Sequence, residues 1–339
     1  MNSITAPRGD PRLEALHAWL AVQLSGAGYT LAPASADASF RRYFRVTVAD
    51  ATRIVMDAPP QHENCRPFIR VAELMREAGL HVPTILASDV EQGFLLLSDL
   101  GVTTYLQALN EANADSLFGD AVNTLIAWQR ASRPGVLPLY DRALLQREME
   151  LFPEWYIGRH LGISLADSQR AVLADIAKLL ADNALAQPSV YVHRDFMPRN
   201  LMLSEPNPGV LDFQDAVYGP ITYDLVSLFR DAFISWPEER ILDWVVRYWE
   251  QAKRLQLPVA ADFGDFYRAF EWMGLQRHLK VLGIFARICH RDGKPAYLED
   301  TPRFLAYARA VCGRYAPLTP LIRLLDELEQ SPPRAGYTF

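Results

Sequence analysis

Within one short stretch of the sequence, residues 189–215, three side chains with oxygen atoms could do chemistry together: Asp195, Asn200 and Asp212. An apolar segment, 189–192, comes shortly before Asp195, and Asn200 and Asp212 follow further along the chain. Amide and carboxylate oxygens suit Mg²⁺, which usually completes its shell with water and phosphate oxygens. The remaining carboxylate could accept the proton of an alcohol. A metal that holds phosphate, together with a base beside a hydroxyl, is the arrangement that phosphoryl transfer needs.

The segment after Asn200 is expected to bring that residue beside Asp212. Residues 201–203 and 210–211 are short apolar runs, and residues 204–209 between them are mostly turn-forming types. Two such runs joined by a turn indicate an antiparallel hairpin, whose outer ends lie side by side. Asn200 precedes the first run and Asp212 follows the second. We therefore expect these two side chains to meet, with the loop of Asp195 at the same edge.

The same residues resemble the motifs of a known family. The run H-R-D at 193–195 continues to Asn200 as H-x-D-x-x-x-x-N, and Asp212 opens a D-F-x motif. Both motifs, in this order, are similar to those of aminoglycoside phosphotransferases and choline kinases. The resemblance implies that Asp195 is the catalytic base and that His193 braces the catalytic loop. It implies ATP and Mg²⁺ as cofactors, with Asn200 and Asp212 as the Mg²⁺ ligands.

Two other runs of the sequence bear on this assignment. Asp224, in a Tyr-Asp-Leu run, matches a later motif of the family, which implies that it stabilises the catalytic loop. A second H-R-D run, residues 290–292, does not continue in the family's way, because the fifth residue after Asp292 is Tyr297 and no D-F-x motif follows. The residues before this run have a helical pattern. We interpret this second copy as chance or as structure of the substrate-binding part.

The expected nucleotide site departs from the protein-kinase pattern. Protein kinases hold ATP phosphates with a lysine on the third strand, but this chain has no lysine before Lys178 and no G-x-G-x-x-G loop. Backbone N–H groups and one arginine could replace that lysine, since the guanidinium fork suits phosphate. The candidate side chains are Ser39, Arg41, Arg42 and Arg45. The alternative is that these arginines are solvated residues of a hairpin.

Residues 97–101 resemble the family's connector that binds adenine. The backbone groups of such a connector pair with the edge of the base, so the side chains there say little about specificity. The nucleotide contacts implied by the resemblance are Leu97, Ser98, Asp99 and Leu100.

These motifs require elements that position them, and the chain supplies two kinds. The first part has a helix pattern at 11–26, a β-hairpin at 43–56, a helix at 67–78 and a buried strand at 93–97. Beyond residue 101 helical patterns dominate: 116–131, 141–161, 165–184, 223–234, 238–256, 263–290 and 301–328. We predict an α+β protein with a small β-rich N-terminal lobe, residues 1–98, a hinge near 97–101 and a mostly helical lobe, residues 99–339. The resemblance implies the bilobal protein-kinase-like fold.

Four runs of the sequence outside the catalytic motifs indicate the acceptor. The runs DASFRRYFRV, LLLSDLG, ELFPEWYIGRHLG and FEWMGLQRHLKVLGIFARI resemble one branch of the family, the anomeric kinases of N-acetylmuramate and N-acetylglucosamine in peptidoglycan recycling. This resemblance implies phosphorylation of the C1 hydroxyl to the α-1-phosphate. A carboxylate-bearing sugar could be held by an arginine or histidine, and a tryptophan could pack on its face. The predicted sugar contacts are Glu150, Trp155, Arg159, Gln276, Arg277 and His278, although aromatic and charged residues at helical spacing also serve as core and capping residues.

Composition limits the partners. The 339 residues carry a formal net charge of −6, half are hydrophobic, and the sequence pI is about 5.7. We therefore expect no nucleic-acid partner and no membrane partner. We also expect a monomer, with an amino sugar and ATP as small-molecule partners. The odd number of cysteines, three, and a start without an apolar segment favour the cytoplasm. Two other functions stay open: a kinase of the same fold acting on another small alcohol or an aminoglycoside, and a pseudokinase, which the missing lysine favours.

Overall fold

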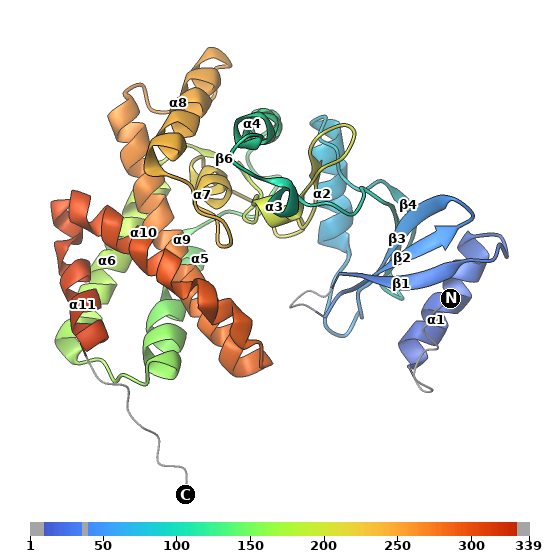
Figure 1. The fold of residues 1–339 in the computed structure, drawn as a ribbon, viewed down its shortest axis with the longest axis horizontal. Coiled ribbons are helices and arrows are strands. Elements are labelled where there is room, and N and C mark those ends of the chain that lie inside the picture. The colour runs from blue at the N-terminus through green and yellow to red at the C-terminus, as the bar shows by residue number, and fades with distance from the viewer. Residues whose placement is uncertain (1–9, 36–39, 331–339) are drawn as a thin grey trace, which may run out of the picture. The chain divides into compact units, whose positions relative to one another are not determined.

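The computed structural model describes residues 10–35 and 40–330 and divides the chain into two compact units (Figure 1). Unit 1 consists of Met1–Ala108 and Asn200–Asp215, and unit 2 of Leu109–Arg199 and Ala216–Phe339. The expected lobe boundary near residue 98 differs from this division in two respects, the first being that unit 1 continues to Ala108. Second, the hairpin after Asn200 belongs with the N-terminal strands rather than with the helices that precede and follow it.

Unit 1 is built on a five-stranded antiparallel sheet with the order β1-β2-β3-β5-β4. The strands are β1 (Thr30–Ser35), β2 (Arg42–Val48), β3 (Ala51–Asp57), β4 (Ile85–Asp89) and β5 (Phe94–Ser98). The expected hairpin is confirmed, because β2 pairs with β3 from Arg42 opposite Asp57 to Val48 opposite Ala51. Side chains alternate between the two faces of a strand. Neighbouring residues of β2 therefore serve different faces of the sheet.

Helix α1 (Pro11–Gln23) covers one face of this sheet (Figure 1). Its first turn is capped by Asp10, whose carboxylate accepts the N–H groups of Arg12 at 3.0 Å and Leu13 at 3.1 Å. The buried side of the helix and the alternate residues of the strands form one apolar core: Leu16, Trp19, Leu20, Leu24, Val46, Val55, Phe94 and Leu96. The helix thus fixes which strand residues face it.

The remaining elements of unit 1 are two helices and a hairpin. They are α2 (Arg66–Glu77), α3 (Tyr105–Ala108), β7 (Leu201–Met202) and β8 (Gly209–Val210). The N–H of Val210 donates to the carbonyl of His81 at 2.8 Å, and the N–H of Leu203 donates to Thr103 at 2.9 Å. These backbone bonds attach the hairpin to the N-terminal unit, although more than ninety residues separate the partners in sequence.

Unit 2 is mostly helical and is organised around its longest helix. Its elements are α4 (Ala114–Arg130), α5 (Arg142–Leu151), the π-helical η1 (Phe152–His160), α6 (Asp167–Ala186), β6 (Ser189–Val192), β9 (Val217–Pro220), α7 (Tyr223–Phe229), α8 (Glu238–Arg254), α9 (Phe263–Asp292), the 3₁₀ turn η3 (Pro295–Asp300), α10 (Thr301–Arg314), the 3₁₀ turn η4 (Ala316–Leu318) and α11 (Thr319–Gln330); a further 3₁₀ turn, η2 (Pro198–Asn200), joins the two units in the chain. Helix α9 packs against α5, η1, α6, α7 and α10 (Figure 1). Within the described part of the chain, no helix combines the length and apolarity that a membrane crossing requires.

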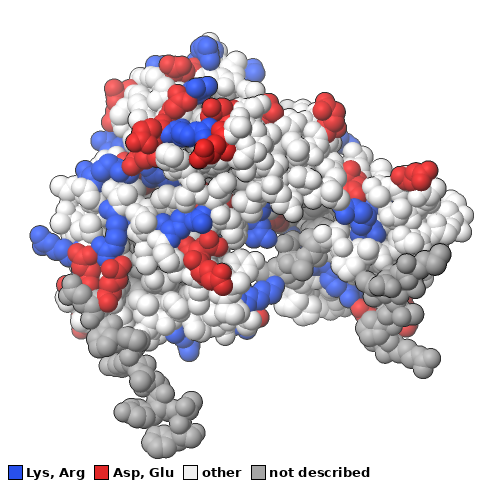
Figure 2. Space-filling model, viewed as in Figure 1, with Lys and Arg blue, Asp and Glu red and all other residues white. Residues whose placement is uncertain are grey.

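The surface mixes charges of both signs. On the face drawn in Figure 2, the basic and acidic side chains of the described residues alternate over the helical unit, with uncharged surface between them. This face therefore presents no broad field of one sign.

Two expected helices differ from the structure. The pattern at 301–328 is two helices, because Tyr315 is extended and Pro317 and Pro320 follow it. A proline cannot donate a helical hydrogen bond and disfavours helix in the residue before it. The pattern at 223–234 ends at Phe229. The strand β9, which pairs with β6, was not expected from the sequence.

Candidate active site

The predicted catalytic loop, which carries Asp195, follows β6 directly in unit 2. The N–H groups of His193 and Arg194 donate to the two carboxylate oxygens of Asp224, at 2.7 and 3.0 Å. Asp224 is in the first turn of α7 and is fully buried. The N–H of Asp195 donates to Nδ1 of His193 at 3.2 Å, and the His193 ring packs edge-on against Phe196. The buried His193 and Asp224 therefore fix the backbone that presents Asp195, which is itself partly exposed.

Glu148 of α5 is a buried carboxylate that binds the side chain of Arg194 in the same loop. It accepts hydrogen bonds from Arg194 at 2.6 Å and from Lys280 at 2.9 Å, and from the hydroxyl of Tyr140. Burial by itself would raise the pKa of Glu148, but the positive charges of Lys280 and Arg194 outweigh it and lower this pKa to about 2. Arg194 has a positive φ of 78°, a conformation that costs energy outside glycine. The ion pairs hold the loop in that conformation.

In unit 1 the hairpin brings the two expected metal ligands together. Asn200 Nδ2 lies 3.4 Å from Asp212 Oδ2, and the N–H of Leu211 donates to the carbonyl of Asn200 at 2.9 Å. Asp212 has a positive φ of 63°, and its second oxygen accepts from Gln214 Nε2 at 2.8 Å. The next residue, Phe213, is buried with its ring centroid 4.7 Å from that of Phe68 in α2. The expected meeting of Asn200 and Asp212 is thus found in the structure.

This pair has the chemistry of a magnesium site. Mg²⁺ is commonly bound in proteins by one or two carboxylates, with water and substrate phosphates completing an octahedron. One carboxylate and one amide oxygen suit that role. Among residues 10–35 and 40–330, no group of three or more His, Cys, Asp and Glu side chains is placed to hold a metal ion. A magnesium ion bound here would therefore take most of its ligands from solvent and nucleotide.

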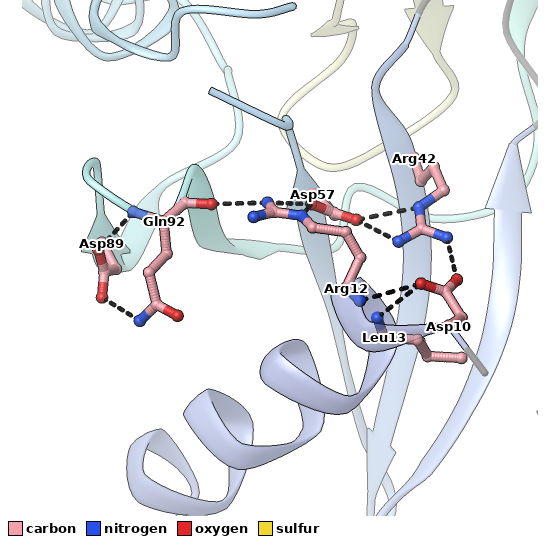
Figure 3. Close-up of polar contacts among 7 residues, drawn as sticks. All are labelled: Asp10, Arg12, Leu13, Arg42, Asp57, Asp89 and Gln92. Carbon is pink, nitrogen blue, oxygen red and sulfur yellow. Dashed lines mark hydrogen bonds and ion pairs between the residues drawn. The ribbon is translucent and has the colours of Figure 1, made fainter. Parts of the chain in front are cut away.

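The three candidate arginines have different positions, and Arg42 lies on the face that α1 covers. Its guanidinium donates to Asp57 at 2.9 and 2.6 Å and to Asp10 at 2.6 Å (Figure 3). Arg12 approaches the other oxygen of Asp57, which is fully buried at the end of β3. Figure 3 shows the two arginines on either side of this carboxylate. Arg42 therefore ties α1 to the sheet, and this placement argues against the phosphate contact considered for it.

Arg45 lies on the opposite face of β2 and binds residues 97–101, the segment predicted to be the hinge. Its Nε donates to Asp99 at 2.6 Å, and its Nη2 donates to the carbonyl of Gly101 at 2.8 Å. Asp99 also accepts the N–H of Gly101 at 3.0 Å. Burial alone would raise the pKa of Asp99, but the hydrogen bond from Arg45 helps to lower it overall. The contacts of Arg45 and Asp99 thus fix the conformation of residues 97–101. In this segment Leu97 and Leu100 are buried, and the Ser98 hydroxyl accepts a hydrogen bond from the N–H of Thr84.

Arg41 precedes β2 and pairs with Glu63, with 2.9 Å between Nη2 and Oε2. Both side chains are mostly buried. Burial lowers the pKa of Arg41, but nearby groups that include Glu63 and Asp215 raise it overall. Asp215 lies three residues after Asp212, the expected metal ligand. Of the candidate arginines, Arg41 is therefore the one within electrostatic reach of this segment. Ser39, the fourth predicted side chain, lies outside the described residues.

The predicted sugar contacts are spread over α5, η1 and α9. Glu150 and Arg159 are exposed, and the Arg159 guanidinium lies 6.0 Å from the ring centroid of Trp155, which packs on the apolar core of unit 2. Gln276 is buried and donates to Glu148 at 3.2 Å. His278 is buried and stacks on Tyr307 at 4.9 Å between ring centroids. The second H-R-D run, at 290–292, is helical as expected and ends α9.

Four buried acidic residues with polar partners are not predicted from the sequence: Asp57, Glu148, Asp231 and Glu271. Their partners lie up to 132 residues away in the chain, as for Glu148 and Lys280. The only sequence signal is an acidic residue within an apolar pattern, which Asp57 shows after Ile54-Val55-Met56. Such a residue is rarely buried unless it is paired.

Comparison with known proteins decides the family. Residues 30–261 match the model described as the phosphotransferase enzyme family. The chain belongs to this family. The expected resemblance to aminoglycoside phosphotransferases and choline kinases is therefore confirmed at the family level.

Individual members resemble this phosphotransferase over nearly its whole length. The N-acetylmuramate/N-acetylglucosamine kinase of Pseudomonas putida is 55% identical over 334 residues, covering 95% of this chain and 98% of that protein. The protein of the same name from Pseudomonas aeruginosa is 58% identical over 300 residues, covering 88% and 89%. Among solved structures, the ADP-bound aminoglycoside phosphotransferase APH(2'')-Ib superposes with a TM-score of 0.56 at 15% identity, covering 86% of this chain and 97% of that one. That structural likeness confirms the protein-kinase-like fold.

Proposed function

We propose that this phosphotransferase is an ATP-dependent sugar kinase that phosphorylates the C1 hydroxyl of N-acetylmuramate and N-acetylglucosamine, giving the α-1-phosphates. One observation carries the proposal: a catalytic loop fixed by Asp224 occurs in a chain that is 55% identical, over nearly full length, to a kinase named for these two sugars. The proposal includes a role in peptidoglycan recycling, as the sequence resemblance implies, and the cytoplasmic location that the cysteine number favours.

In the proposed reaction, Asp195 acts on the acceptor hydroxyl. The C1 oxygen attacks the γ-phosphorus of ATP, the bond from that phosphorus to the bridging oxygen of ADP breaks, and the hydroxyl proton passes to the Asp195 carboxylate. Asn200 and Asp212 would hold Mg²⁺, which when bound offsets the negative charge of the phosphate oxygens. Positioning and electrostatics supply most of the rate enhancement in this class of reaction.

The nucleotide contacts follow from the positions of the arginines. We assign the phosphate contact to Arg41, which Glu63 orients in the way that the helix glutamate orients the lysine of protein kinases. Residues 97–101, shaped by Arg45, would bind adenine through backbone groups. This assignment supplies a cation in place of the absent lysine and so weakens the case for a pseudokinase.

A coupled ADP-release assay tests the proposal. Mg²⁺–ATP is supplied with N-acetylmuramate, N-acetylglucosamine, glucose, choline or kanamycin, and phosphorus NMR identifies the product. We expect release with the two N-acetyl sugars and phosphate on C1. Asp195→Asn should lower kcat by about 10²- to 10⁴-fold, whereas Asp175→Asn, an exposed carboxylate on α6, should leave it unchanged.

Release with kanamycin or choline alone would replace the proposed acceptor while keeping the kinase. No release with any acceptor, in a protein that still binds ATP by calorimetry, would favour the pseudokinase. Full activity of Asp195→Asn would remove the catalytic role from Asp195.

A further inference from the structure

In unit 2, the buried Arg277 of α9 has a guanidinium without a hydrogen-bond partner among the described residues. The residue is 2% exposed, and neither a hydrogen bond nor an ion pair joins its side chain to another described residue. Its Nη1 atom is fully enclosed without a partner, whereas Nε and Nη2 are not enclosed in this way. A guanidinium carries five N–H donors. A buried charge is costly unless an oppositely charged or hydrogen-bonding group satisfies it.

Two carboxylates lie within electrostatic reach of Arg277 but bond elsewhere. Asp224 accepts the N–H groups of His193 and Arg194, at 2.7 and 3.0 Å. Asp231 uses Oδ2 to accept backbone N–H groups of the turn that follows it, at 2.8 and 3.2 Å, and its Oδ1 is enclosed without a partner. Both carboxylates thus hold the backbone. The donors of Arg277 are left for another acceptor.

The charge of Arg277 is also only partly offset. Burial raises the pKa of Asp224 to about 7, so this carboxylate is partly protonated near neutral pH, and burial raises the pKa of Asp231 as well. Their neighbour Arg230 is itself a cation, engaged with Glu271 at 3.0 Å. The surroundings of Arg277 therefore favour an additional negative charge.

The position of Arg277 connects it with the catalytic loop of the same unit. Its neighbour Asp224 binds that loop, and the hydroxyl of Ser227 lies 3.4 Å from the carbonyl of Arg194. The turn held by Asp231 contains Phe233, whose half-buried ring lies 5.0 Å from the guanidinium carbon of Arg199. The unsatisfied donors thus lie among the residues that support the segment presenting Asp195.

We propose that Arg277 binds the lactyl carboxylate of N-acetylmuramate and so determines how well the enzyme uses the acid-bearing sugar. This inference rests on the proposed function. The two proposed sugars differ only in the lactyl ether, and that group carries the one negative charge of the larger sugar. An arginine fork offers two parallel N–H bonds to a carboxylate, which gives geometric specificity as well as attraction. Asp231 positions the turn beside it and would accept a sugar hydroxyl through Oδ1.

The test compares the two sugars in wild type and in Arg277→Met, which keeps an unbranched side chain of similar reach without the charge. We expect kcat/KM for N-acetylmuramate to fall by about 10- to 100-fold, the loss of a charge-assisted hydrogen bond. Activity on N-acetylglucosamine should change less than threefold and reports that the variant is folded. Arg277→Lys, which keeps the charge without the fork, should recover part of the loss.

A second arm changes the ligand instead of the protein. The methyl ester of N-acetylmuramate keeps the ether but has no charge, so wild type should use it as poorly as Arg277→Met uses the acid. The ester should lose nothing further in the variant, because the two changes remove the same contact.

Equal losses on both sugars in Arg277→Met would overturn the inference and make Arg277 a structural residue, while wild-type turnover of both sugars would leave the proposed function intact. An ester that wild type uses as well as the acid would also overturn it. Wild type that phosphorylates neither sugar would remove the proposed function and, with it, the inference.

Discussion

At the scale of single residues, strand geometry separates two neighbouring arginines that the sequence presents as equals. Arg42 lies in β2 on the side of Phe44 and Val46, against α1, where it binds the buried Asp57. Arg41, one residue earlier, pairs with Glu63. A run of arginines indicates that the residue type suits phosphate, but it does not show which arginine binds phosphate. The role of each arginine is set by its carboxylate partners: Asp10 and Asp57 for Arg42, Glu63 for Arg41 and Asp99 for Arg45. Sequence spacing could not predict these partners.

Arg41→Met should raise KM for ATP by about tenfold or more, since a charge-assisted hydrogen bond to phosphate is lost. KM for the sugar should stay within twofold. Steady-state kinetics with varied Mg²⁺–ATP measures this, and Arg76→Met, an exposed residue of α2, is the control. An unchanged KM for ATP in Arg41→Met would show that the phosphate is held by other groups.

The buried Asp224 predicts a pH dependence of stability. Burial is the largest influence and raises its pKa from 3.8 to about 7, although the N–H groups of His193 and Arg194 act to lower it. In the unfolded chain this carboxyl loses its proton near pH 4. Between about pH 4 and 7 the native state therefore binds a proton that the unfolded state lacks, and the free energy of unfolding falls as the pH rises through that window.

Asp224→Asn removes this titration. Urea unfolding at pH 5 and pH 7 gives the free energy of unfolding of wild type minus that of the variant. This difference should be lower at pH 7 than at pH 5 by about 2 kcal/mol. The variant should be the less stable protein at pH 5, because one backbone N–H of the catalytic loop loses its acceptor. Asp175→Asn should differ from wild type equally at both pH values. The same constancy in Asp224→Asn would contradict a raised pKa.

At the scale of elements, the sequence predicts structure correctly where the signal is local and incorrectly where distant partners define the element. The β2–β3 hairpin and the hairpin at Asn200–Asp212 were predicted because turn residues and apolar runs are adjacent in sequence. The split of 301–328 was missed because the periodicity of apolar residues continues across Pro317 and Pro320. Strand β9 is not predicted by the sequence, because its four residues form a strand only through pairing with β6. Short strands of this kind are defined by their partners rather than by their own pattern.

The approach of α9 to the end of α5 depends on a glycine. A Cβ atom at Gly283 would lie 2.3 Å from the carbonyl carbon of Leu151 and 2.4 Å from its oxygen, and these are backbone atoms that cannot turn aside. At the next residue, Phe152, the helix becomes π-helical, and Pro153 lacks the N–H that an α-helix would use there. The close approach and the change of helix type thus occur at one place.

Gly283→Ala should destabilise the protein by at least about 1–3 kcal/mol, since overpacking forces α5 and α9 apart. Gly119→Ala is the matched control, because the position lies within α4 and a Cβ there meets nothing within 4 Å. The control should be neutral or more stable by up to about 1 kcal/mol. Urea unfolding measures both, and an alanine tolerated equally at the two positions would disprove the close approach.

At the scale of the whole molecule, the predicted catalytic motif is continuous in sequence but divided between the compact units. Asp195 belongs to unit 2, whereas Asn200 and Asp212 belong to unit 1. The sequence predicted the residue types and the hairpin correctly. It could not predict this division, because the backbone bonds of the hairpin are made to His81 and Thr103. The chain passes between the units at residues 108–109, 199–200 and 215–216.

Magnesium binding at Asp212 should appear in the stability of the whole protein. A ligand that binds only the native state adds about 2.7 kcal/mol to the free energy of unfolding at 100 times its Kd. Wild type should therefore show a larger rise in Tm with Mg²⁺–ATP than with ATP and EDTA. In Asp212→Asn the two rises should be equal, because a neutral amide replaces the carboxylate ligand. Asp175→Asn should behave as wild type, and a magnesium-dependent rise that survives in Asp212→Asn would remove the metal role from Asp212. Because Tm reports binding without turnover, this result holds whichever sugar the enzyme accepts.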